Sequence, residues 1–145
     1  MRWNPISTGL AAVAMLSSTV AVSQENSGKK FQVTLEGEVE VPKPGDLDGT
    51  GSATIRINPG QGQLCYTLTV SGIAPATAAH IHEAPAGAAG PVIVGLKAPA
   101  NGMSEGCAEI SREQAKEIMK DPANYYINVH NAEFPGGALR AQLSM

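Results

Sequence analysis

Residues 53–70 read ATIRINPGQGQLCYTLTV, and this stretch indicates the fold class. Ala53, Ile55 and Ile57 alternate with polar residues, which is typical of a strand with one buried face. The segment from Leu64 to Val70 alternates in the same way. Because the turn-forming residues of NPGQG join the two segments, we expect them to pair as an antiparallel hairpin.

The same pattern continues on both sides of this hairpin. Alternation over 31–41 predicts a first strand, and further short strands are expected at 77–83, 92–97, 105–110, 125–130 and 138–143. A short helix is expected to begin after Ser111, which can cap it, with Gln114 at the capping-box position. About eight strands and one short helix predict an all-β fold, an antiparallel Greek-key β-sandwich or barrel.

Length and charge limit the function classes. The chain has 145 residues, enough for one compact domain, which we place at residues 31–145. Its formal net charge is −3 at pH 7. A nucleic-acid-binding protein needs a basic face, so we expect no nucleic-acid partner. The apolar content is also too low for a protein with several membrane spans.

The N-terminal residues 1–23 have the pattern of a secretory signal peptide. Arg2 precedes a small, apolar stretch, and small residues at 21–23 suit a cleavage site. A membrane anchor is the alternative, but the stretch is short and interrupted by Ser and Thr. We therefore expect cleavage, a flexible lead-in at 24–30, and a periplasmic or secreted protein without stable membrane insertion.

The two cysteines, Cys65 and Cys107, are interpreted in the light of this export. In an oxidising compartment they most simply pair with each other in a structural disulfide. Two separate thiols are the alternative. The spacing excludes a catalytic Cys-x-x-Cys motif.

Three histidines are the candidate metal ligands. His80 and His82 occupy positions i and i+2 of an expected strand, so their side chains share one face, with Cα atoms about 7 Å apart. Ile81 between them then points into the core. His130 ends the expected strand at 125–130. The alternative is that each histidine is a surface residue or a structural hydrogen-bonding group.

The loops beside the histidines, residues 84–91 and 134–137, are rich in Gly and Pro and leave room for a site. Three neutral imidazoles suit copper or zinc, and the affinity order of divalent ions favours Cu(II). A site with an open position could instead hold zinc and a water molecule. Glu133 lies near His130 in the sequence and is a candidate additional ligand, or a group that orients a histidine.

Two blocks of the chain resemble the signature blocks of the CHRD domain, the family named for chordin. They read AHIHEAPAGAAGPVIV at 79–94 and YINVHNAEFPGGALRAQL at 126–143. The resemblance covers about residues 30–143. It implies a secreted β-domain and suggests a role in adhesion or protein interaction.

A more distant resemblance is to copper/zinc superoxide dismutase, a Greek-key β-sandwich with a disulfide inside the domain. His80 and His82 resemble that family's paired copper ligands, and His130 resembles its late copper ligand. Arg140 lies near the position of the arginine that guides the anion. No residue here matches the histidine that bridges copper and zinc, or the other zinc ligands.

Three functions follow as hypotheses. The first is an exported copper-binding protein for storage, delivery or detoxification, which exchanges copper with a partner. The second is a dismutase-like copper enzyme that acts on superoxide, with Arg140 as its catalytic guide. The third is a metal-free adhesion or protein-interaction module in which the histidines are structural.

Overall fold

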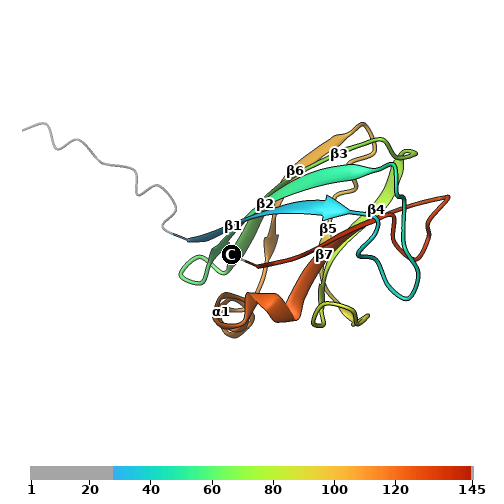
Figure 1. Cartoon of the computed structure of the whole chain (residues 1–145). Helices are drawn as coiled ribbons and strands as arrows, with labels where there is room; N and C mark the ends of the chain where they lie inside the picture. Colours follow the sequence, from blue (N-terminus) through green and yellow to red (C-terminus); the bar gives the residue numbers. More distant parts are fainter. Residues whose placement is uncertain (1–27, 145) are drawn as a thin grey trace, which may run out of the picture.

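Eight antiparallel strands form one sheet in residues 28–144, the part of the chain that the computed structural model describes (Figure 1). The strands, one helix and one 3-10 turn follow the chain as β1 Lys29–Glu36, β2 Thr50–Asn58, β3 Gln63–Ser71, β4 Ala76–Glu83, β5 Val92–Leu96, β6 Met103–Glu109, α1 Arg112–Lys120, η1 Pro122–Asn124, β7 Tyr125–Asn131 and β8 Leu139–Gln142. Their order across the sheet is β5-β4-β7-β8-β1-β2-β3-β6. The predicted all-β class is confirmed, and the sheet curls into a nearly closed barrel.

The two edge strands of the sheet are tied together through side chains. The Tyr66 hydroxyl on β3 accepts a hydrogen bond of 2.7 Å from the backbone N–H of Lys97, just after β5. Ser104 on β6 donates to the carbonyl oxygen of Lys97 at 2.7 Å. These contacts connect the end of β5 to the opposite edge, which limits the exposure of unpaired strand edges.

The core lies inside the barrel. Alternate residues of the predicted hairpin point inward, and Ile55, Ile57 and Leu64 are fully buried there. Helix α1 lies at one end of the barrel (Figure 1) and buries Ala115 and Ile118. It begins as predicted, because the side chain of Ser111 accepts a hydrogen bond from the backbone N–H of Gln114.

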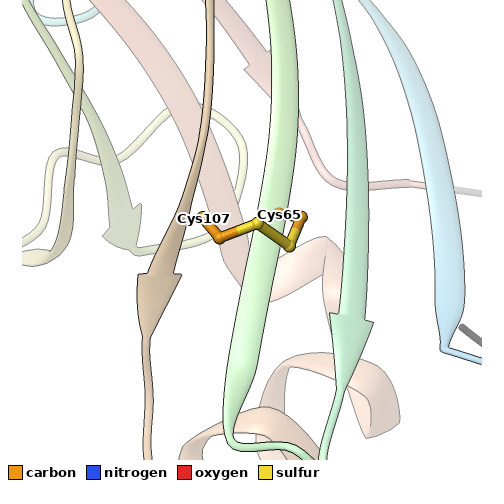
Figure 2. The surroundings of a disulfide bond; sticks show 2 residues. All are labelled: Cys65 and Cys107. Atoms are coloured by element: carbon orange, nitrogen blue, oxygen red, sulfur yellow. A yellow bond between two sulfur atoms is a disulfide. The ribbon is translucent and has the colours of Figure 1, made fainter.

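The predicted disulfide is present between β3 and β6 (Figure 2). Cys65 and Cys107 lie directly opposite each other in the ladder of these two strands, and their sulfur atoms are 2.08 Å apart. The bond therefore fastens β6, an edge strand, to the body of the sheet.

The first strand is shorter than the sequence pattern predicts. We expected it to extend over 31–41, but β1 ends at Glu36. The carbonyl oxygen of Gly37 accepts from the N–H groups of Glu40 and Gly45, which turns the chain out of the sheet. A Cβ atom at Gly37 would lie 2.0 Å from a backbone oxygen of Asp46, so only glycine allows this close approach.

The expected signal peptide at 1–23 and residues 24–27 of the expected lead-in lie outside the described residues. Strand β1 begins at Lys29, two residues earlier than the alternation suggested. Within residues 28–144, no helix has both the length and the apolar character needed to cross a membrane.

Candidate metal centre

The three histidines meet on the face of the sheet that is turned away from the core. Strands β4 and β7 pair antiparallel, with His80 opposite Asn128 and His130 opposite Ala78. One ring nitrogen from each histidine lies within 4.8 Å of the other two. The Nδ1 atom of His80 is 3.1 Å from the Nε2 atom of His130. The predicted convergence is confirmed, and the three residues could hold one metal ion.

The opposite face of the same strands fixes this arrangement. Ile81 lies between the two histidines of β4 and is fully buried, as expected, and it pairs with Ile127 of β7, which is also fully buried. A shift of one residue in the register would turn these isoleucines outward and the histidines inward. Burial of the apolar face therefore holds the histidines on the other face.

Backbone carbonyl groups orient two of the three imidazole rings. The Nδ1 atom of His82 lies 2.9 Å from the carbonyl oxygen of Gly90, and the Nδ1 atom of His130 lies 3.0 Å from that of Pro135. A carbonyl oxygen can only accept, so the neutral rings carry their proton on Nδ1. Their Nε2 atoms then carry the lone pairs that a metal ion would use, and they face Asn128 and, for His130, also His80.

The loop after β4 supplies one of these carbonyl groups because glycine permits its path. A Cβ atom at Gly90 would lie 1.9 Å from the carbonyl oxygen of Glu83. The N–H group of Gly90 donates to the hydroxyl of Tyr126 at 3.2 Å. The glycine-rich loop thus packs against the site, as its composition suggested.

The environment keeps His80 and His130 in the form that binds metals. Burial lowers the pKa of His80, and the neighbouring His130 and His82 lower it further. Burial also lowers the pKa of His130, against an opposing effect of its hydrogen bond to Pro135, and His82 lowers it as well. Both rings are therefore neutral at pH 7, and a neutral imidazole is the ligand form.

Asn128 is a residue of the centre that we did not predict as a ligand. Its side chain is only 3% exposed, and its Oδ1 atom lies 3.0 Å from Nε2 of His82 and 3.0 Å from Nε2 of His130. The sequence feature that could have identified Asn128 is its position two residues before His130, which places both on the same face of the strand. A neutral amide among histidines gave no chemical reason to single it out.

Arg140 lies on the same face but is separated from the histidines by an aromatic ring. Its guanidinium carbon is 3.5 Å from the ring centre of Tyr126, and that ring stacks on His82 with centres 4.7 Å apart. The Nη2 atom donates to the carbonyl oxygens of Pro85 and Ala88. Arg140 is 2% exposed, and its expected role as an anion guide stays a prediction.

Glu133 is exposed in the loop between β7 and β8. Among residues 28–144, the cluster that could hold a metal ion consists of the three histidines and does not include it. Its expected role as a ligand or an orienting group stays a prediction.

Glu40 is a second residue that sequence reasoning missed. The alternation over 31–41 placed it on a solvent-facing side, but the turn after β1 leaves it 5% exposed. Burial raises its pKa to about 7, against opposing effects of the Val41 N–H group, the Arg140 charge and a hydrogen bond with the Asn128 side chain. Glu40 therefore lies buried close to Arg140 and Asn128.

The fold and site together define a disulfide-bonded β-barrel with a three-histidine cluster on its outer face. Residues 31–143 match the family model of the CHRD domain, so the chain belongs to the CHRD domain family. No curated protein and no solved structure matches the chain.

Proposed function

We propose that this protein is exported and binds one copper ion through His80, His82 and His130. The observation that supports the proposal is the meeting of three ring nitrogens from two separate strands within 4.8 Å. Donor atoms at such distances can share one ion, because metal–imidazole bonds are about 2.0–2.1 Å long.

Copper is the ion that this chemistry favours. Imidazole suits both copper and zinc, and Cu(II) stands highest in the affinity order of divalent ions. Zinc is the second candidate, since three histidines with a fourth coordination position left for water also form zinc sites. A protein outside the cytosol would store, deliver or detoxify copper and would exchange it with a partner.

Two features support export. The disulfide between Cys65 and Cys107 is typical of proteins that fold in an oxidising compartment. The N-terminal sequence has the features of a signal peptide. A periplasmic or secreted location is therefore the setting that we propose for the metal site.

The first experiment titrates Cu(II) and Zn(II) into the untagged chain from residue 24, in competition with a coloured chelator. We expect one Cu(II) per chain. His82→Ala and His130→Ala should each weaken binding by at least about 100-fold, because removing an outer-shell partner of a ligand already costs 10- to 100-fold. Met103→Ala is the control for adventitious copper binding, because this thioether is exposed on β6. Affinity that is unchanged in both histidine variants would reject the three-histidine site.

A metal-free interaction module is the second candidate, and a specific observation favours it. His82 and His130 each have a carbonyl partner for Nδ1, and His130 also lies within hydrogen-bond distance of His80. Histidines that only support structure would show the same contacts. In that case the titration finds no stoichiometric binding, and the histidine variants lose stability instead.

The dismutase-like alternative is tested on the same copper-loaded protein. We expect superoxide consumption no faster than that of free copper, because Arg140 is engaged by loop carbonyls and is 2% exposed. Consumption well above free copper that is lost in His80→Ala and in Arg140→Met would instead establish the enzyme.

A further inference from the structure

We propose that the side-chain oxygen of Asn128 is the fourth donor of the metal centre. This inference rests on the proposed metal binding. It adds an oxygen to the three nitrogens.

The first argument is the arrangement of lone pairs. Because Gly90 and Pro135 take the Nδ1 protons, the Nε2 atoms of His82 and His130 are acceptors. Both point at Oδ1 of Asn128, which is also an acceptor, at 3.0 Å. The Nδ1 atom of His80 lies 3.1 Å from Nε2 of His130 and can donate to it, whereas Oδ1 of Asn128 then faces two lone pairs. A cation among these atoms would bind the oxygen and both Nε2 atoms.

The second argument is the placement of the amide. Asn128 lies opposite His80 in the β4–β7 ladder, and its side chain is 3% exposed. The strand register that brings the histidines together therefore also holds this amide among them.

A set of three imidazoles and one amide oxygen has a chemical preference. Oxygen is a harder donor than sulfur or nitrogen, so it favours a divalent ion over Cu(I). We therefore expect the centre to select Cu(II), with Zn(II) next. The amide should contribute little to the binding of Cu(I), which is satisfied by imidazoles.

The test compares Asn128→Ala with Asn128→Asp, which keeps an oxygen at the same distance from the backbone. We expect Asn128→Ala to weaken Cu(II) binding by about 10- to 100-fold and to leave Cu(I) binding within about threefold. Asn128→Asp should bind Cu(II) at least as tightly as the parent chain, and it should shift the visible spectrum of the Co(II)-loaded protein. Gln32→Ala is the control, because this amide is exposed on β1, away from the histidines.

The outcomes separate this inference from the proposed function. Tight Cu(II) binding that Asn128→Ala does not change would overturn the fourth donor and leave the three-histidine site standing. Absence of metal binding in the parent chain would overturn both. Nitrogen-15 NMR of the chelator-treated protein gives a further readout: we expect unprotonated Nε2 atoms in His82 and His130, and protonated ones would contradict the convergence of acceptors.

Discussion

Glu40 lies in the turn after β1, and Arg140 lies on β8. Both ionisable side chains are buried. They influence each other's pKa, and each keeps one buried polar atom, Oε1 of Glu40 and Nη1 of Arg140, without a hydrogen-bond partner in residues 28–144. Such groups reduce stability, since an unpaired buried polar atom costs about 1–3 kcal/mol.

The raised pKa of Glu40 predicts how the stability of the metal-free protein depends on pH. Its pKa is about 7 in the folded chain and 4.5 in the reference state, so the folded chain binds more protons between these values. The contribution of Glu40 is therefore fully present below pH 4.5 and is lost as the pH rises through 7. The loss is at most about 3 kcal/mol.

Urea unfolding of the chelator-treated protein from pH 4.5 to 8 measures this effect. The difference between the parent chain and Glu40→Gln should grow with pH, with the variant the more stable at pH 8. A difference that is constant across this range would show that Glu40 has an ordinary pKa.

At the scale of elements, two loops determine the environment of β4 and β7. The loop after β4 is held by Arg140, whose Nη2 atom donates to Pro85 and Ala88, and by Gln142, which donates to Ala84. The loop after β7 contributes the Pro135 carbonyl that orients His130. The strands place the histidines, and the loop carbonyls determine which ring nitrogens of His82 and His130 face the cluster.

Adjacent glycines of the β7–β8 loop provide a matched pair of substitutions. Gly137→Ala should destabilise the protein by about 1–3 kcal/mol, because its φ is 141° and a Cβ would contact the Glu40 carboxyl. Gly136→Ala should be nearly neutral, since a Cβ there meets no atom within 4 Å. Thermal unfolding of both variants checks this, and equal melting temperatures would contradict the argument.

At the scale of the whole molecule, the disulfide and the candidate centre lie on different parts of the sheet. Cys65 and Cys107 join β3 and β6, whereas the histidines lie on β4 and β7, near the other edge in strand order. The bond closes a sequence separation of 42 residues, which corresponds to about 4 kcal/mol in the chain-entropy model.

We therefore expect the double variant Cys65→Ala/Cys107→Ala to lose about 2–4 kcal/mol in free energy of unfolding. Its Cu(II) affinity, measured on the folded protein well below the melting temperature, should stay within about threefold of the parent value. A large loss of affinity in chains that remain folded would show that the disulfide shapes the centre directly.

The sequence by itself determined the features that depend on local periodicity. Alternation with period two located the strands, Ser111 marked the start of the helix, and the His80-Ile-His82 spacing placed two imidazoles on one face. The same alternation misplaced residues 37–41, because a turn that depends on the contact between Gly37 and Asp46 interrupts it. Neighbours along the chain do not carry the information for that contact.

Only the tertiary structure decided how the centre is completed. His80 and His130 are 50 positions apart, and they meet because β4 pairs with β7 in one register. The burial of Glu40, the direction of the Asn128 amide and the stacking of Arg140 on Tyr126 likewise depend on which strands and loops lie next to each other. Packing of the whole apolar face of the sheet determines these contacts. A local sequence pattern therefore does not reveal which distant residue will lie next to a given side chain.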